Sequence, residues 1–188
     1  DCMGKASGTF VGNAGVFSKV YYPRLVVPIS GVISNLVRLI IQLGLFLAVY
    51  FYFVYNGTDI KPNIYILFFP LLVLMLAGLG LGFGILISSV TTKYRDMAIL
   101  FGFVTGLWMY ATPIIYPLSV MKEKYEEYMW IIQLNPLTSI VEALRYGFMG
   151  AGTVDWFWLS YSCVVTIIVI ILGSWVFNKV ERSFIDVV

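Results

Sequence analysis

Four long apolar stretches constrain the fold of this chain more than any other feature of its sequence. The clearest of them, residues 64–90, carries no charged side chain. About 20 helical residues cross a hydrocarbon layer about 30 Å thick, and a segment isolated in lipid must satisfy its own backbone hydrogen bonds. The sequence therefore predicts an all-α, polytopic membrane protein with one transmembrane domain, whose full spans lie at residues 32–55, 64–90, 97–116 and 156–177.

The composition favours the same class of protein. Of the 188 residues, 60% are hydrophobic and 12% are charged, whereas about 25% of the residues of a soluble domain are charged. A water-soluble core of this size could not bury so much apolar surface, so the bilayer must solvate much of it. The formal net charge of +2 is too small to indicate a nucleic-acid partner.

Residues for the common catalytic and metal sites are scarce. The chain has no histidine, and its two cysteines, Cys2 and Cys163, lack the spacing of a metal or redox pair. The glycine-rich loop with Lys and Ser or Thr that holds ATP phosphates is also missing from the sequence. We therefore expect no catalytic residue, no metal and no cofactor bound by this chain itself.

Four alternate glycines lie inside the uncharged stretch. Gly78 and Gly82 are four residues apart, as are Gly80 and Gly84. This small-xxx-small spacing allows two helices in a membrane to approach closely. We interpret the glycines as helix-packing residues and not as a phosphate-binding loop.

Residues 120–150 differ from the spans because a charged cluster and an Asn135-Pro136 turn interrupt them. Neither half is long enough to cross a bilayer, so we expect two short helices that form an outward-facing re-entrant pair. A surface hairpin in the headgroup layer is the alternative. Glu142 and Arg145 are three residues apart and would share one face of the second helix, where they can form an ion pair. That pair would be structural or would take part in gating.

The distribution of Lys and Arg predicts the orientation. It places residues 1–31, the loop at 91–96 and the tail at 178–188 on the cytoplasmic side. We read residues 1–31 as the end of a preceding span followed by an amphipathic segment. Because the chain starts at Asp1 without a signal-peptide pattern, we expect it to lack an N-terminal part.

Three aromatic residues lead into the helix break at Pro113. They would line a path on which sugar rings stack, or would belong to an interfacial aromatic belt. The three are Trp108, Tyr110 and Tyr116.

Five short motifs, taken in order, resemble the permease subunits of ABC-2 type polysaccharide exporters, which handle O-antigen, capsular polysaccharide or teichoic acid. The motifs are Asn13 to Arg24 with Pro28, Tyr94-Arg95-Asp96, Thr112-Pro113-Ile114-Ile115-Tyr116-Pro117, Asn135-Pro136-Leu137-Thr138 with Glu142 and Arg145, and Val180 to Asp186.

The resemblance implies a six-span permease fold, of which we expect this chain to lack the N-terminal part. It implies a homodimer in the bacterial inner membrane that moves lipid-linked polysaccharide from the cytoplasm, while a separate ABC ATPase subunit binds ATP and Mg. Together with the residue patterns above, it leads us to predict three sets of site residues. They are an ATPase-coupling segment with Asn13, Val16, Phe17, Lys19, Tyr22, Pro23 and Arg24, a cytoplasmic loop with Arg95 and Asp96, and an outer gate with Asn135, Pro136, Glu142 and Arg145.

Other functions remain open at this point. An ion-coupled secondary transporter would place ionisable groups near the middle of the membrane, but the clear spans hold no acidic residue. A membrane-embedded transferase would need a pair of carboxylates near a membrane face, and Glu142 and Asp155 form no evident pair in the sequence. An ABC-2 exporter of another amphiphile, such as a drug, would share the same motifs.

Overall fold

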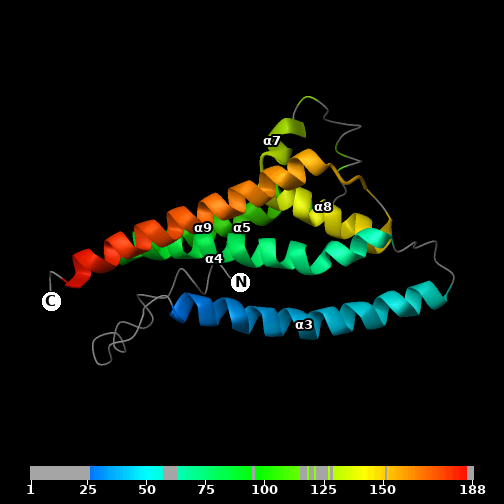
Figure 1. The fold of residues 1–188 in the computed structure, drawn as a ribbon, viewed down its shortest axis with the longest axis horizontal. Coiled ribbons are helices and arrows are strands. Elements are labelled where there is room, and N and C mark those ends of the chain that lie inside the picture. Colours follow the sequence, from blue (N-terminus) through cyan, green and yellow to red (C-terminus); the bar gives the residue numbers. More distant parts are fainter. Residues whose placement is uncertain are drawn as a thin grey trace. The chain divides into compact units, whose positions relative to one another are not determined.

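The computed structural model describes residues 26–56, 63–94, 96–114, 118, 121, 127, 129–150 and 152–185. Within these residues the chain has six α-helices, one 3-10 helix and no strand (Figure 1), which confirms the all-α prediction. The elements are α3 (Val26–Tyr55), η1 (Ile64–Phe68), α4 (Phe69–Lys93), α5 (Met97–Ala111), α7 (Met129–Gln133), α8 (Pro136–Met149) and α9 (Trp156–Ile185).

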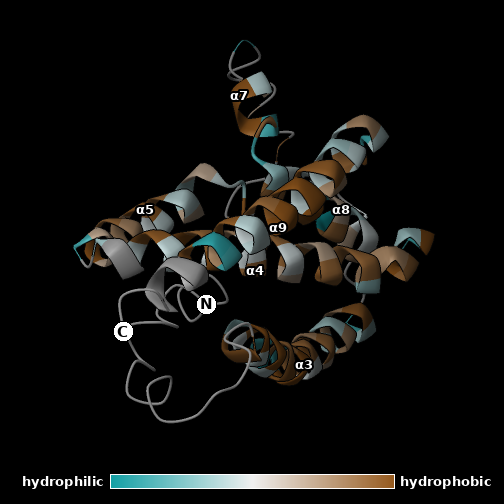
Figure 2. Ribbon diagram, turned by 60° about the vertical axis from the view of Figure 1, so that its left-hand side comes forward, coloured by the Kyte–Doolittle hydropathy of each residue, from teal (hydrophilic) through white to brown (hydrophobic). Residues whose placement is uncertain are grey.

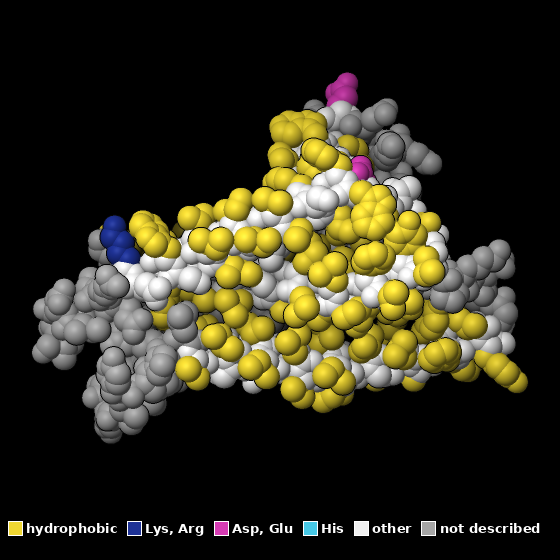
Figure 3. All heavy atoms as spheres, viewed as in Figure 1, with side chains coloured by type: hydrophobic (Ala, Val, Ile, Leu, Met, Phe, Trp, Pro, Cys, Tyr) yellow, Lys and Arg dark blue, Asp and Glu magenta, His cyan; other side chains and the backbone are white. Residues whose placement is uncertain are grey.

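Three helical stretches are long and apolar enough to cross a membrane, and they coincide with three of the predicted spans. They are Val26–Tyr55, Ile64–Thr91 and Trp156–Val180. Figure 2 shows hydrophobic residues along most of α3, α4 and α9. On the face drawn in Figure 3, hydrophobic side chains cover most of the described surface and charged ones are few. Such a surface suits lipid and not water.

Two of these helices extend past the predicted ends. Helix α3 begins at Val26 and not at residue 32, and it contains Pro28. A proline is tolerated there because the N–H groups of the first helical turn have no partner within the helix. Helix α9 continues to Ile185, so residues 178–185, expected to be a tail, are helical.

The third predicted span, at residues 97–116, is shorter than expected. Helix α5 has 15 residues and ends at Ala111, whereas the sequence analysis carried it to Tyr116. At about 1.5 Å per residue it is about 22 Å long, which is less than a hydrocarbon layer of about 30 Å. Pro113 accounts for the early end, because proline has no N–H to donate and disfavours the helical conformation of Thr112 before it.

The chain divides into two compact units. The first contains residues 1–38, 77–105 and 166–188, and the second contains residues 39–76 and 106–165.

In the first unit, α4 and α9 pack with their backbones in contact. A Cβ atom added at Gly78 would lie 2.9 Å from Thr166 Cγ2, and one added at Gly82 would lie 2.8 Å from Val169 Cγ1. On the other helix, a Cβ at Gly173 would lie 2.8 Å from the carbonyl oxygen of Gly82. Only glycine allows such an approach, so the helix-packing interpretation of Gly78 and Gly82 is confirmed.

In the second unit, aromatic rings from α3 and α4 surround Phe148 of α8. The ring centroids of Phe46, Tyr50 and Phe69 lie 5.2, 6.2 and 5.6 Å from that of Phe148, with near-perpendicular planes. Edge-to-face pairs of this kind stabilise a core beyond the area they bury. Tyr50 is buried in this cluster.

Helix α8 also contacts η1 directly in this unit. The Asn63 N–H donates to the Gly147 carbonyl at 3.0 Å. A Cβ at Gly147 would lie 3.3 Å from the Ile66 nitrogen. This contact and the aromatic cluster hold the C-terminal half of α8 and so position its polar side chains.

Candidate functional site

Helix α8 begins and ends at strong local signals. Asn135 is its N-cap, and the Asn135 side-chain oxygen accepts a hydrogen bond from the Leu137 N–H at 3.1 Å. Pro136 occupies the first turn, where its missing N–H costs nothing. At the other end Gly150 adopts the left-handed conformation, with φ 67°, and its N–H donates to the Tyr146 carbonyl.

The same asparagine connects α8 to the end of α5. Asn135 Oδ1 also accepts from Trp108 Nε1 at 3.2 Å, and Asn135 Nδ2 donates to Thr112 Oγ1 at 2.9 Å. The Thr112 hydroxyl in turn donates to the Trp108 carbonyl at 3.0 Å. Each polar atom of the Asn135 side chain therefore has a partner, and α5 and the α7–α8 turn are joined by side chains.

Arg145 makes a second connection between α8 and the end of α5. Its Nη1 donates to Glu142 Oε2 at 2.8 Å, which confirms the predicted ion pair. Its Nη2 donates to the carbonyl oxygens of Pro113 and Ile114 at 3.1 and 3.0 Å. Carbonyls after the last helical turn carry a partial negative charge, so the guanidinium stabilises the broken end of α5. We call Trp108, Thr112, Pro113, Asn135, Glu142 and Arg145 together the α5–α8 junction.

Glu142 is the buried acid of this junction, with 3% of its surface exposed. Burial raises the pKa of its carboxyl group, while the Arg145 charge and hydrogen bond and the backbone N–H of Leu118 oppose that rise. Helix α8 is not among the candidate membrane spans. Among the described residues, Glu142 Oε1 has no hydrogen-bond partner.

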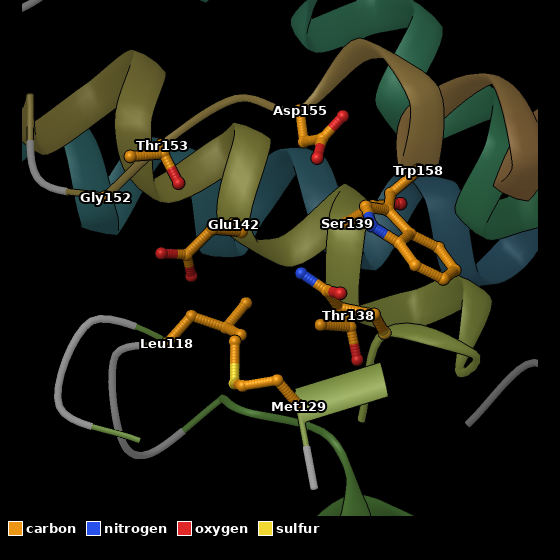
Figure 4. A pocket seen from close by; sticks show the side chains of 10 residues that line it. Leu118, Met129, Thr138, Ser139, Glu142, Gly152, Thr153, Asp155 and Trp158 are labelled. Atoms are coloured by element: carbon orange, nitrogen blue, oxygen red, sulfur yellow. The ribbon is translucent and has the colours of Figure 1, made fainter. Parts of the chain in front are cut away.

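A cavity of about 210 Å³ lies next to the junction in the second unit (Figure 4). Asp155 lies at its rim and caps α9, because Asp155 Oδ1 accepts from the Phe157 N–H at 2.9 Å. Ser139 is hydrogen-bonded to Ser162 at 2.7 Å, which joins α8 to α9. The side chains that give the cavity its polar and aromatic character are Gln133, Thr138, Ser139, Glu142, Asp155 and Trp158.

The structure brings some of the predicted site residues together. Asn135, Glu142 and Arg145 of the predicted outer gate meet Trp108 of the predicted aromatic path in the junction. Tyr110 is largely exposed on α5, away from these hydrogen bonds.

Other predicted site residues lie elsewhere. Asp96 is exposed in the turn before α5, where its carbonyl accepts from the Ile99 N–H. The coupling segment with Asn13, Val16, Phe17, Lys19, Tyr22, Pro23 and Arg24 lies outside the described residues, as do Arg95 and Tyr116.

Sequence reasoning missed three features of the site. One sequence signal could have indicated the role of Thr112 and the Arg145–carbonyl contacts. A Thr-Pro pair that ends a helix leaves carbonyl groups without a hydrogen-bond donor. No sequence signal indicates the cavity, because Asp155 and Trp158 at the start of α9 are distant in the sequence from the α8 residues that they meet there. Within the part of the chain that the structure describes, no group of three or more His, Cys, Asp or Glu side chains could hold a metal ion.

Comparison with known proteins identifies the family. The profile of the ABC-2 type transporter family matches residues 5–149, which is more than half of the chain. The chain belongs to the ABC-2 type transporter family. Membership of this family agrees with the candidate membrane spans. The matched residues include the whole α5–α8 junction.

Curated relatives of this ABC-2 chain are bacterial. Two proteins of Klebsiella pneumoniae, each named O-antigen export system permease protein RfbA, are 29% and 28% identical to it over 180 residues. Those alignments cover 95% of this chain and 66% of each relative. The protein of the same name in Myxococcus xanthus is 22% identical over 184 residues, covering 98% of this chain and 68% of the relative. The chain therefore spans about two thirds of the length of these relatives.

Proposed function

We propose that this chain forms most of the transmembrane permease subunit of an ATP-driven ABC exporter of lipid-linked polysaccharide, of O-antigen, capsule or teichoic acid type. The observation that carries the proposal is the similarity to O-antigen export permeases along 95% of the chain. Family membership and the apolar spans support a transport role in a bacterial inner membrane. In this proposal the subunit provides path and gate and performs no covalent chemistry.

The proposed topology has four crossings in this chain, within a six-span subunit. Helix α5 and the residues after it complete the third crossing, and α7 and α8 form the outward-facing re-entrant pair. Two observations support this arrangement. Both α7 and α8 are too short to cross a bilayer, and the backbone at their turn is satisfied by protein groups, as a buried turn requires.

The proposed partner is a separate ABC ATPase that binds ATP and Mg, and two copies of the permease form a homodimer. The amphipathic segment with Val16 and Phe17 would dock on the ATPase. ATP-driven closure of two ATPases would then separate the spans of the two permease copies and let the glycan pass.

The α5–α8 junction is the proposed outer gate. Arg145 holds the end of α5 against α8 by two carbonyl contacts and the Glu142 ion pair. Opening would exchange these contacts for water or for the passing substrate.

An ATP-driven export assay tests the proposal. The full-length protein is purified with any associated ATPase, reconstituted into vesicles and supplied with lipid-linked glycan and ATP. We expect an ATPase to co-purify, and we expect substitution of Val16 and Phe17 by Asp to remove it. Glycan should reach the far side only when ATP and the ATPase are present.

Two results would count against the proposal. Lack of an ATPase under every condition would contradict the coupling to ATP and would favour gradient-driven flux. Co-purification of an ATPase with transport of small amphiphiles but not glycan would leave an ABC-2 exporter of another substrate class.

A further inference from the structure

The cavity beside α8 has room for one small ligand. Its volume of about 210 Å³ is below the about 300–1,000 Å³ of pockets that take drug-sized molecules. Figure 4 shows the walls supplied by α8, by the loop that contains Gly152 and Thr153, and by the start of α9. All of them belong to the second unit.

Glu142 gives the cavity a buried acceptor that the described chain does not use. Only 3% of the residue is exposed, and its Oε2 is engaged by Arg145 while Oε1 has no hydrogen-bond partner. A buried acceptor in this state is costly unless a ligand or water satisfies it. A Cβ at Gly152 would collide with Oε1, so only glycine fits against this atom.

Asp155 adds a second acceptor at the rim. Its Oδ1 accepts from the Phe157 N–H, which leaves Oδ2 for a ligand. The charge of each carboxylate already has a partner, since Arg145 offsets Glu142 and the α9 N-terminus offsets Asp155. The cavity therefore offers acceptor atoms without a strong demand for a cation, and two carboxylates would repel an anion.

Trp158 provides the apolar surface of the cavity. It projects from α9 at the end opposite Glu142 in Figure 4. The rings of Phe157 and Tyr161 meet it in T-shaped contacts at 5.5 and 5.7 Å, which fix its orientation. A flat indole face can pack against the C–H face of a sugar ring, whose hydroxyl groups then point toward the acceptors.

We propose that this cavity is a binding site for a single uncharged sugar unit, which packs on Trp158 and donates hydroxyl hydrogen bonds to Glu142 Oε1 and Asp155. The inference rests on the proposed function, because the sugar unit would belong to the glycan that the permease moves. The ring-sized volume, the buried unpartnered acceptor and the aromatic wall all occur in the same cavity.

Ligand-detected saturation-transfer NMR tests the site. The full-length protein is kept in a detergent without sugar headgroups, and the probes are methyl glycosides of glucose, galactose and mannose. Glucuronic acid and tetramethylammonium serve as the anionic and cationic probes. We expect transfer to at least one neutral glycoside and none to the two charged probes.

Variants place the binding in the cavity. Trp158→Ala should weaken neutral glycoside binding about tenfold, whereas the matched control Trp130→Ala, at an exposed tryptophan outside the cavity, should leave it unchanged. If Trp158→Ala does not fold, Thr153→Trp fills the cavity from its exposed rim and should abolish binding.

The outcomes separate this inference from the proposed function. Equal binding to wild type, Trp158→Ala and Thr153→Trp, or transfer only to tetramethylammonium, would overturn the sugar site even if the wild-type protein exports glycan. Cavity-dependent sugar binding by a protein that fails the ATP-driven export assay would support the site and reject the export function.

Discussion

The α4–α9 contact of the first unit and the α5–α8 junction of the second hold helices together by different physical means. In the first, Gly82 and Gly173 let the two backbones approach closely, and van der Waals contact between them stabilises the pair. In the second, Asn135 and Arg145 connect helix ends through hydrogen bonds and an ion pair. Glycines have no side chain that could find another partner, whereas polar groups can exchange one hydrogen-bond partner for another. This difference fits the proposal above, in which α4–α9 is a fixed element and the junction is the part that rearranges.

Arg145→Ala should have the largest effect on stability. It leaves Glu142 buried without its ion-pair partner and the end of α5 without a donor, and breaking such a pair costs about 3–5 kcal/mol. Unfolding of the full-length protein in mixed detergent and SDS measures this loss. Lys179→Ala is the control, because Lys179 is an exposed cation whose contact with Trp175, at 5.4 Å, contributes only about 0.5–1 kcal/mol. Equal effects at the two positions would contradict the role given to the junction.

Gly82→Ala should reduce the free energy of unfolding by about 1–3 kcal/mol through overpacking. The new Cβ would lie 2.8 Å from Val169 Cγ1 and 3.0 Å from the Ile170 nitrogen, so the α9 backbone must move. Gly102→Ala on α5 is the matched control, since nothing lies within 4 Å of its Cβ position, and it should be neutral or stabilising. Equal changes in the free energy of unfolding for the two substitutions would contradict the claim that the α4–α9 contact is fixed.

Asn135→Ala should cost about 0.5–2 kcal/mol through loss of the α8 cap, and it also removes the links to Trp108 and Thr112. Asn135→Asp keeps the acceptor for Leu137 and Trp108 but cannot donate to Thr112, so its cost should be smaller, about 0.5–1.5 kcal/mol. Thermal unfolding of both variants provides the comparison. The reverse order of the two costs would show that the cap is not the main contribution of Asn135.

A dependence on pH should be the smallest effect, because Arg145 opposes it. Burial raises the pKa of Glu142 above its ordinary value of 4.5, so the folded state holds this proton when the unfolded state has released it. The stability from this group is therefore fully present below pH 4.5 and is lost as pH rises through the folded value. Unfolding measured across this range should show that decline in wild type and a flatter profile in Glu142→Gln. Identical profiles would exclude Glu142 as the source.

The sequence was sufficient to predict the features of the fold that depend on residues close together in the chain. Residues 64–90 must be helical because lipid offers the backbone no other hydrogen-bond partner. Glu142 and Arg145 must share a helix face because they are three residues apart. Pro113 predicted the break in α5 but not that the helix would already end at Ala111.

The remainder depended on partners distant in the sequence. Asn135 reaches Thr112 and Trp108 across 23 and 27 residues, and no periodicity indicates which residue lies opposite it. Gly78 and Gly82 identified a close-packing face, but nothing in their spacing selected Thr166 or Gly173 of α9 as the partner. The cavity is a further case, since it forms only when α8 and the start of α9 lie together.

A reversible cross-link across the junction is the most direct test of the central claim. Thr112→Cys and Asn135→Cys are combined in the full-length protein after Cys2 and Cys163 have been replaced by serine, because the two native side chains are already in hydrogen-bond contact at 2.9 Å. We predict that oxidation stops ATP-driven glycan export while the ATPase remains bound, and that reduction restores export. Export by the cross-linked protein at the rate of the reduced protein would contradict the account, because the junction would then not need to open.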